Sequence, residues 1–513
     1  MNPIELSLFA SRLSAVCDEM GTVLRRSALS PNIKDRLDFS CAVFNAEGEL
    51  CAQAAHIPVH LGSMAFAMAD IVERLAWAEG DMIILNDPFL GGTHLPDVTV
   101  IAPVFVADAL VGFVANRAHH ADIGAATPGS MPLSTTLHEE GLIIPPSYLL
   151  RRGSMDDAFL DHVARQTGNP AGTVADFTAQ ASANRVGVRR VRALVESLGV
   201  AKFGAGLTAL NDYAESLAHR ALSLLPNGRY AFTDVMDDDG QGNINLPIAV
   251  TLLVREGRVA VDFAGTAAQV KGNINCPLSV AAAAVFYVFR CSMPSYTPAC
   301  AGTFRSIRVV APEGSLVNAQ RPAAVVAGNV ETSTRIVDAL LGALAQACPD
   351  LIPAASHGSM NNVAMGARGP RNWDYYETIG GGMGAGRCGG GWHGVQTHMT
   401  NTLNTPVESV EMHYPLRIRR YALRRGSGGI GTRAGGDGLV REFEFLSDAT
   451  VTLLTERRTT APWGLAGGGP GAVGRNVLNG EILPAKATCR VTSGDRLVIE
   501  TPGGGGWGGP EQS

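Results

Sequence analysis

Histidine is concentrated in one part of this chain, where it could bind a metal ion. Six of the twelve histidines lie between residues 56 and 138. His94 is followed by Asp97 three positions later, and His119 and His120 follow Asp97 after 22 and 23 residues. Two imidazoles and a carboxylate are a common ligand set for Zn²⁺, Mn²⁺ or Fe²⁺. Because a single His-x-x-Asp arises easily by chance, a metal site requires a fold that brings a second histidine to it.

A predicted β-hairpin supplies that fold. Val98–Phe105 and Val111–Ala115 are rich in β-forming residues and are joined by a short, polar-interrupted link. With the link centred near residue 108, paired positions sum to about 216 or 217, which places Asp97 opposite His119 or His120. Directly paired residues have Cβ atoms ~4.5–5.5 Å apart, a separation that suits two ligands of one ion.

The third ligand comes from the loop that leads into the hairpin. His94 follows Gly91 and Gly92, which allow the chain to fold back sharply. We therefore predict one divalent ion, Zn²⁺, Mn²⁺ or Fe²⁺, held by His94, Asp97 and His119.

Two further polar residues precede this region. Asp38 opens a predicted strand that runs to Phe44, and an aspartate there usually pairs with an arginine or caps a turn. His60 is a candidate to line the site, whereas His56 is expected to be an ordinary polar residue. From the residues alone, Asp38 has no assigned role.

Composition excludes several classes of protein. The chain has 513 residues, 46% apolar and 17% charged, which is typical of a globular protein of two or three domains. Its net charge of −6 and the absence of a Lys/Arg run argue against a nucleic-acid partner. Nine scattered cysteines without a C-x-x-C pair favour a reducing compartment. With no signal peptide and no run of 18 apolar residues, we expect a cytoplasmic protein with no membrane partner.

Periodicity predicts a mixed α+β fold of several antiparallel hairpins and mixed sheets with helical insertions. We expect an N-terminal helix capped by Asn2, hairpins turning at residues 45–48 and 256–257, and helices over 278–289 and 332–347. Sixty glycines indicate many tight turns and close backbone contacts. The expected divisions are an N-terminal α/β region with the metal-binding hairpin (1–154), a mainly helical segment (155–225), a mixed α/β region (226–375) and a glycine-rich, mostly β region (376–513), whose tail 502–510 is not regular structure.

On these residues the sequence resembles the hydantoinase B/oxoprolinase family along nearly its whole length. The matching stretches are Asp38–Ser40, Asn86–Thr99, Ala115–Pro132, Glu139–Leu142, Pro145–Pro146, Asp262–Thr266, Gly272–Asn275, Asn401–Thr402, Glu408 and Ser427–Gly431. The resemblance implies a partner, a hydantoinase A-type subunit with an actin-like ATPase fold, that phosphorylates the carbonyl oxygen of a lactam, an imide or a ketone. The metal-bearing half then completes the chemistry, so we expect a hetero-oligomer.

The resemblance also implies site residues. Related ketone carboxylases carry His-x-x-Asp and a histidine 25 residues after the first, a spacing kept by His94, Asp97 and His119. Asp38 matches an aspartate implicated in lactam-opening relatives, as a ligand or as a base. We expect Asp38, His120 or Asp122 to orient a metal-bound water or accept its proton.

The expected function is therefore the metal-dependent B subunit of an ATP-dependent cyclic amide hydrolase, which opens a hydantoin, 5-oxoproline or a similar ring. Two alternatives stay open, an ATP-dependent ketone carboxylase subunit and a non-catalytic scaffold with a structural metal. No G-x-x-x-x-G-K-[ST] loop occurs, and Gly426–Gly431 matches G-x-G-x-x-G without a helix pattern after it. ATP is therefore expected to be used by the partner subunit.

Overall fold

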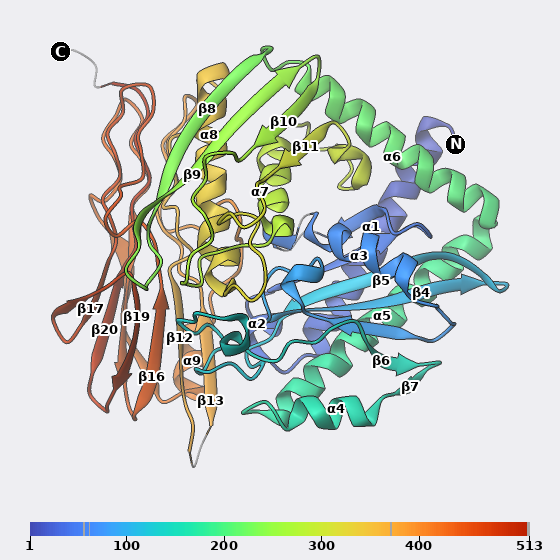
Figure 1. Cartoon of the computed structure of the whole chain (residues 1–513), viewed down its shortest axis with the longest axis horizontal. Coiled ribbons are helices and arrows are strands. Elements are labelled where there is room, and N and C mark those ends of the chain that lie inside the picture. The colour runs from blue at the N-terminus through green and yellow to red at the C-terminus, as the bar shows by residue number, and fades with distance from the viewer. Residues whose placement is uncertain (55–56, 61, 370–371, 510–513) are drawn as a thin grey trace.

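The computed structural model describes residues 1–54, 57–60, 62–369 and 372–509; His56 and Pro510 lie outside them. It confirms the α+β prediction: four separate β-sheets are combined with long helices. Figure 1 shows the N-terminal sheet and its helices on one side, the β8–β11 sheet with α7 and α8 beside it, and the C-terminal strands stacked on the opposite side.

The N-terminal sheet has seven strands in the order β2-β1-β5-β4-β3-β6-β7, and its neighbours are antiparallel. Two of the three predicted hairpins, the one that turns at residues 45–48 and the metal-binding one, lie in it. Its strands are β1 (Phe39–Phe44), β2 (Leu50–Ala54), β3 (Met82–Leu85), β4 (Asp97–Val106), β5 (Ala109–His119), β6 (Ser147–Arg151) and β7 (Ser154–Met155).

The helices within the first 222 residues pack around this sheet. Asn2 caps α1 as predicted, because its side chain accepts the Glu5 amide while the Glu5 side chain accepts the Asn2 amide. The predicted helical segment packs on the sheet, since α5 contacts α1, β4 and β5. These helices are α1 (Pro3–Ser27), α2 (Pro31–Lys34), α3 (Ser63–Arg74), α4 (Asp157–Ala164), α5 (Pro170–Leu198) and α6 (Val200–Leu222).

A second, four-stranded sheet has the order β11-β10-β9-β8, in which β10 and β11 are parallel. The predicted hairpin at residues 256–257 joins β9 to β10, and α8 packs against β8 and β9. A short π-helix, Gly328–Thr332, leads directly into α8. The elements are β8 (Gly228–Asp238), β9 (Ile244–Arg255), β10 (Arg258–Asp262), α7 (Leu278–Cys291), β11 (Ile307–Val310) and α8 (Ser333–Ala347).

The C-terminal part contains two sheets, ordered β13-β12-β16-β19 and β14-β15-β20-β17-β18. The expected boundary near residue 375 falls inside β13, so the sheets do not follow it: β13 pairs with β12, which pairs with β16. The elements are β12 (Asn362–Ala367), β13 (Trp373–Glu377), α9 (Val407–His413), β14 (Leu416–Arg424), β15 (Gly438–Phe445), β16 (Ala449–Leu454), β17 (Arg475–Leu478), β18 (Glu481–Leu483), β19 (Lys486–Val491) and β20 (Arg496–Glu500).

Glycine allows extended C-terminal segments to lie directly against one another. The Gly436 amide donates to Met383 O at 2.8 Å, and the Gly504 amide donates to Gly436 O at 2.9 Å. A Cβ on Gly504 would lie 2.1 Å from Met383 O, which no side chain tolerates. The tail is therefore buried and hydrogen-bonded, although it is not a regular strand, and the close contacts expected from the glycine content are present.

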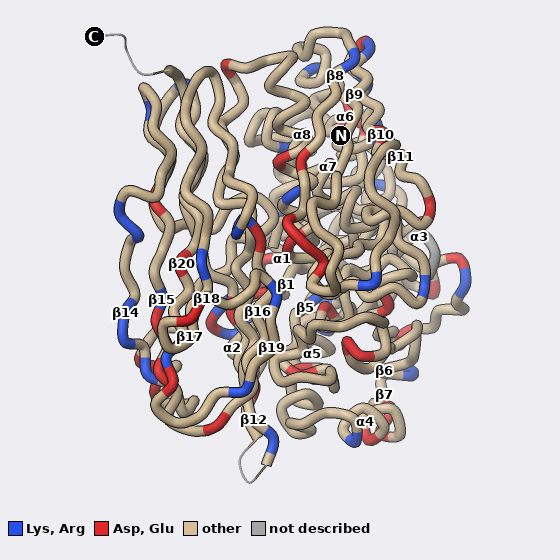
Figure 2. The backbone as a smooth tube through the Cα atoms, turned by 60° about the vertical axis from the view of Figure 1, so that its left-hand side comes forward, with Lys and Arg blue, Asp and Glu red and all other residues tan. Residues whose placement is uncertain are grey.

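Strand β14 forms one edge of its sheet and carries a high density of arginine (Figure 2). Arg419 pairs with Glu444 on the neighbouring strand β15 at 2.6 Å, and Arg424 lies 3.4 Å from Glu500. Charged side chains on an exposed edge oppose pairing with other chains. Among the described residues, no single helix is long and apolar enough to cross a membrane; α5 and α6 pass that test only together and are bent by 108° at their junction.

A buried ionic cluster joins the second sheet to the C-terminal part. The Arg457 guanidinium lies 2.8 Å from Asp234 of β8 and 2.5 Å from Asp338 of α8. Arg335 of α8 contacts the same two aspartates and Glu456. Both arginines are fully buried, so each depends on its partners to offset the loss of hydration.

We expect Arg457→Met to lower the free energy of unfolding by about 3–5 kcal/mol, because it removes one of the two buried cations that pair with the buried carboxylates of Asp234 and Asp338. Arg190→Met is the matched control, since Arg190 pairs with Glu19 through two contacts at the surface and its loss should destabilise the protein far less. Urea unfolding measures both. Equal destabilisation by the two changes would contradict the role assigned to the cluster.

Candidate metal centre

The hairpin register brings the predicted ligands together. Asp97 pairs directly with His119, and positions summing to 216 stay paired as far as Val104 and Gly112, beyond which the register shifts by one. This confirms the predicted pairing and selects His119 rather than His120 as the residue opposite Asp97. The bend that the loop makes before β4 carries His94 back over the same strand ends.

One ligand atom from each of His94, Asp97 and His119 lies within 4.8 Å of the others. His94 Nε2 lies 3.3 Å from Asp97 Oδ2, and the rings of His94 and His119 are 5.1 Å apart, edge to face. All three are buried, with exposed fractions of 0%, 1% and 3%. The side chains therefore converge on one point inside the protein.

The donor atoms fit a metal ion. Among the residues that the structure describes, neither His94 Nε2 nor His119 Nε2 has a hydrogen-bond partner outside the three candidate ligands, although both atoms are buried. His94 Nδ1 lies 3.2 Å from Val326 O, to which it donates, so the neutral ring keeps its lone pair on Nε2. A metal-binding histidine is ordinarily held in this way through its other nitrogen. Two buried nitrogens without partners beside a carboxylate form a set that a divalent cation would complete.

The charges are arranged for cation binding. Burial alone would raise the pKa of Asp97, but His94 and His60 hold it well below its usual range. Burial and the neighbouring His94 lower the pKa of His119 well below its usual range. Burial opposes the charged form of His94 as well, yet Asp97 raises its pKa overall. Asp97 is thus ionised and His119 neutral at neutral pH, as metal ligands must be.

Asp97 also has contacts that the sequence did not indicate. Thr93 Oγ1 donates to Asp97 Oδ2 at 2.5 Å, and Asn329 Nδ2 lies 3.4 Å from the same oxygen. His60, expected only to line the site, places Nε2 3.4 Å from that oxygen and Nδ1 3.0 Å from Ser40 Oγ. Asn329 lies 232 residues from Asp97, so no local pattern could indicate it.

A small cavity of about 20 Å³ adjoins the ligands. That volume holds about one water molecule. Asp38 lies on the wall of the cavity, 3.6 Å from the Arg36 guanidinium. Burial raises the pKa of Asp38, and the charge of Arg36 opposes that rise. The remaining wall is made by Ile57, Val59, His60, Asp97, His119, Asn329, Val330, Met360, Tyr376, Thr378, Met399, Thr400 and Thr402.

His119 is held from both sides. Its Nδ1 lies 3.2 Å from the Asn32 side-chain amide, and its ring stacks on Tyr376 at 4.8 Å with an angle of 9°. The Tyr376 hydroxyl donates to Asn362 Oδ1 at 2.8 Å, and Asn362 Nδ2 donates to Glu331 Oε1 at 2.6 Å. A series of side-chain contacts therefore links His119 to the buried carboxyl group of Glu331.

His120 and Asp122 lie elsewhere. Successive residues of a strand point to opposite faces, so His120 turns away from the cavity that His119 lines and places Nε2 3.0 Å from Gln180 Oε1. Asp122 Oδ2 accepts the amides of Gly168 and Asn169 at 2.6 and 2.9 Å, just before α5 begins. The structure thus does not bring these two residues to the site where we expected them to act on water.

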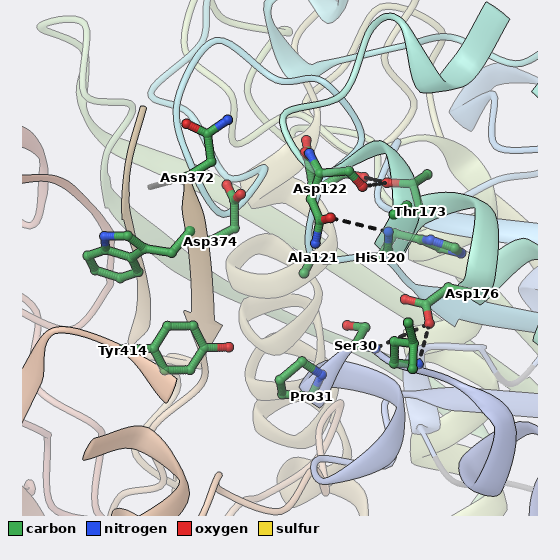
Figure 3. Close-up of a pocket in the computed structure, with 15 residues that line it drawn as sticks. Ser30, Pro31, His120, Ala121, Asp122, Thr173, Asp176, Asn372, Asp374 and Tyr414 are labelled. Atoms are coloured by element: carbon green, nitrogen blue, oxygen red, sulfur yellow. Dashed lines mark hydrogen bonds between the residues drawn. The ribbon is translucent and has the colours of Figure 1, made fainter. Parts of the chain in front are cut away.

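Both residues line a larger pocket of about 360 Å³, which Figure 3 shows between α2, the start of α5 and β13. Its carboxylates are already bound within the protein. Asp176 accepts the amides of Leu29 and Ser30, and Asp374 pairs with Arg368. The contacts of Asp176 therefore hold the chain directly before α2, and this pocket is separate from the candidate metal centre.

The family is shown by comparison with known proteins. The profile of the hydantoinase B/oxoprolinase family matches residues 2–510, and the chain belongs to this family. It is 41% identical to an uncharacterized protein of Methanocaldococcus jannaschii, covering 99% of this chain and 91% of that one. It is 33% identical to the B subunit of a putative D-/L-hydantoinase from a Pseudomonas strain, covering 99% and 90%.

Other relatives are longer. The chain is 40% identical to 5-oxoprolinase 1 of Arabidopsis thaliana, with 98% of this chain covered but only 42% of that protein. Among solved structures, an ATP-dependent caprolactamase from Pseudomonas jessenii is similar with a TM-score of 0.93 and 28% identity over 99% of this chain and 92% of that one. An acetone carboxylase shares the fold, with a TM-score of 0.88 and 18% identity over 99% and 76%.

The buried Glu331 predicts a pH dependence of stability. Burial, and then repulsion from Glu456, raises the pKa of Glu331 to about 8. The folded protein therefore holds this proton more tightly than the unfolded chain, whose glutamate pKa is about 4.3. The stabilisation is complete below about pH 4 and is lost as pH rises to about 8.

Glu331→Gln should remove this contribution, so its free energy of unfolding should fall less steeply between about pH 5 and about pH 8 than that of the unaltered protein. Urea unfolding across this range measures the slope. Glu196→Gln, on an exposed position of α5, should leave the slope unchanged. Parallel slopes for the unaltered protein and Glu331→Gln would show that Glu331 does not titrate in this way.

Proposed function

We propose that this chain is the metal-dependent B subunit of an ATP-dependent cyclic amide hydrolase, acting with an ATPase partner on a hydantoin, 5-oxoproline or a related lactam or imide. The observation that carries the proposal is the buried convergence of His94, Asp97 and His119, with two imidazole nitrogens that have no hydrogen-bond partner outside these three residues in the part of the chain that the structure describes. The similarity to an ATP-dependent caprolactamase and to 5-oxoprolinases supports the lactam chemistry.

In this proposal His94, Asp97 and His119 hold one divalent ion, Zn²⁺, Mn²⁺ or Fe²⁺. A bound Zn²⁺ lowers the pKa of water to about 7 and so supplies a nucleophile near neutral pH. Asp97 is kept ionised by His94 and His60, and Val326 O fixes the orientation of His94. These contacts set the ligands in place before any substrate enters, which is the main contribution of a protein to such a site.

We assign proton acceptance to Asp38. Its carboxyl group lines the cavity beside Asp97 and His119, and burial raises its pKa toward the range useful for a general base. Arg36, 3.6 Å away, holds the carboxyl group in place. Because the cavity has room for about one water molecule, a ring-shaped substrate requires its wall to open.

ATP is used by a partner in this proposal. An amide resists attack because its nitrogen donates into the carbonyl group, and phosphorylation of the oxygen removes much of that resonance. This chain contains no Walker-type phosphate loop. Its similarity to the B subunit of a putative hydantoinase supports a separate ATPase subunit and a hetero-oligomer. The nine free cysteines support a reducing compartment such as the cytoplasm.

A ketone carboxylase subunit is the second candidate. The observation in its favour is the shared fold with an acetone carboxylase. The two functions differ in the co-substrate, because a carboxylase requires bicarbonate and a hydrolase requires water. A scaffold with a structural metal would keep no open coordination position, so exchange of a metal-bound water would exclude it.

We expect His94→Ala and His119→Ala to abolish binding of the single metal ion, because each removes a buried ligand. His120→Asn is the matched control, since the adjacent histidine points to the other pocket and its loss should leave the metal content unchanged. Elemental analysis of folded, metal-loaded protein measures the outcome. Full metal retention in both ligand variants would rule out this metal centre.

With a co-purified ATPase partner, the complex should hydrolyse ATP in the presence of a lactam or imide and release a ring-opened product without bicarbonate. Asp38→Asn should slow ring opening by about 100-fold or more, typical for loss of a general base, while metal content stays near that of the unaltered chain. Product analysis against a panel of lactams, imides and ketones measures the first result. Turnover that needs bicarbonate and a ketone would favour the carboxylase instead.

A further inference from the structure

The backbone segment that orients His94 is itself held by a buried carboxylate. Val326 O accepts the hydrogen bond from His94 Nδ1 at 3.2 Å. The amides of Val325 and Val326 both donate to one oxygen, Oε1 of Glu140, at 2.8 and 2.9 Å. Glu140 ends the short 3₁₀ helix Leu137–Glu140 and is fully buried. Glu140, 186 positions before Val326 in the chain, thus fixes the carbonyl that orients a candidate ligand.

The four successive backbone amides of residues 325–328 each donate a hydrogen bond within the protein. Glu140 binds the first two, and the backbone oxygen of Asn273 accepts the amides of Ala327 and Gly328 at 3.0 and 3.1 Å. Asn329, the next residue, reaches Asp97 at 3.4 Å. The segment 325–329 therefore contacts two of the three candidate ligands, and its position depends on what holds its first two amides.

Glu140 has one further partner among the residues that the structure describes. Ser134 Oγ donates to Oε1 at 2.8 Å, while Oε2 is buried without a partner there. Hydrogen bonds to an ionised acceptor are roughly twice as strong as neutral ones, so a carboxylate holds the two amides more firmly than a neutral group would. A negative charge buried near the ligands also favours a cation at the site, because nearby apolar surroundings screen it little.

We propose that Glu140 is a positioning residue of the metal centre: it fixes the segment at Val325 and Val326 so that Val326 O holds His94 with Nε2 toward the ion, and its charge adds to the attraction for that ion. The inference depends on the metal centre of the proposed function. Glu140 does not touch the ion, so its contribution is expressed in metal affinity.

Two variants separate the carboxylate's charge from its contacts. Glu140→Gln keeps an oxygen acceptor but removes the charge, and Glu140→Met removes both at similar size. Loss of an outer hydrogen-bond partner typically lowers metal affinity about 10–100-fold. We expect about 10-fold weaker Zn²⁺ binding in Glu140→Gln and up to about 100-fold weaker binding in Glu140→Met.

Zn²⁺ affinity is measured by competition with a chelator at about pH 8, above the pKa of about 7 that burial gives Glu140. The visible spectrum of the Co²⁺-substituted protein reports whether the ligand geometry changes. The matched control is Asp81→Asn, because Asp81 is also a buried carboxylate whose oxygens accept two amides, from Arg152 at 2.8 Å and Ala78 at 3.0 Å, on the far end of β3. It should lower stability without weakening Zn²⁺ binding.

The outcomes separate this inference from the proposed function. If the unaltered protein binds none of Zn²⁺, Mn²⁺ and Fe²⁺, the metal centre itself is wrong, and this inference with it. If the unaltered protein binds Zn²⁺ and folded Glu140→Gln binds it equally well, with an unchanged Co²⁺ spectrum, only the role of Glu140 is overturned. Equal weakening by Asp81→Asn would show a general effect of stability and would overturn it too. If Glu140→Met does not fold, Glu140→Gln decides the question.

Discussion

The antiparallel pairing of β4 with β5 is the constraint on which the candidate site depends. Asp97 and His119 sit opposite each other because the register runs without a shift from the strand ends to Val104. A shift of one residue would turn every side chain of one strand to the other face. His120 would then replace His119 at the cavity and lose its hydrogen bond to Gln180 of α5, which lies on the other face of the sheet.

Much of the site comes from distant parts of the chain. Asp38 lies just before β1, Asn329 in the π-helix before α8, and Tyr376 in β13, yet all three line one cavity. A buried histidine loses its hydrogen bonds to water and must recover them within the protein. His119 recovers contact through Asn32 and Tyr376, whereas the Nε2 atoms of His94 and His119 have no hydrogen-bond partner outside the candidate ligands among the described residues. An unpaired polar atom is costly in a core, so a metal ion gives these two a physical reason to be there.

The rest of the fold keeps these segments in contact. The ionic cluster around Arg457 joins β8, α8 and the C-terminal strands, and the glycine-rich segments pack by direct backbone contact where any side chain would collide. Both features fix the C-terminal part, which supplies Tyr376, Thr378 and Thr402 to the cavity wall. The small volume of that cavity follows from this close packing and makes access for a substrate dependent on movement of the wall.

Local patterns in the sequence account for the parts of the site that lie close together in the chain. Two runs of β-forming residues around a short link set the hairpin and its register, and therefore the meeting of Asp97 with His119. A glycine pair before His94 allowed the fold-back, and the capping pattern at Asn2 and Glu5 set the first helix. In each case the interacting residues are near neighbours in the chain, where propensity and turn chemistry act directly.

Tertiary packing determined which residues from distant parts of the chain also lie at the candidate metal centre. It placed His60, Asn329 and Tyr376 at the ligands, turned His120 and Asp122 to a separate pocket, and paired β12 with β16 across the expected boundary. Sequence proximity suggested His120 and Asp122, but side-chain direction alternates along a strand and a carboxylate near a helix start is bound by its amides. Contacts over hundreds of residues depend on how the sheets pack, and no short pattern in one sequence encodes that.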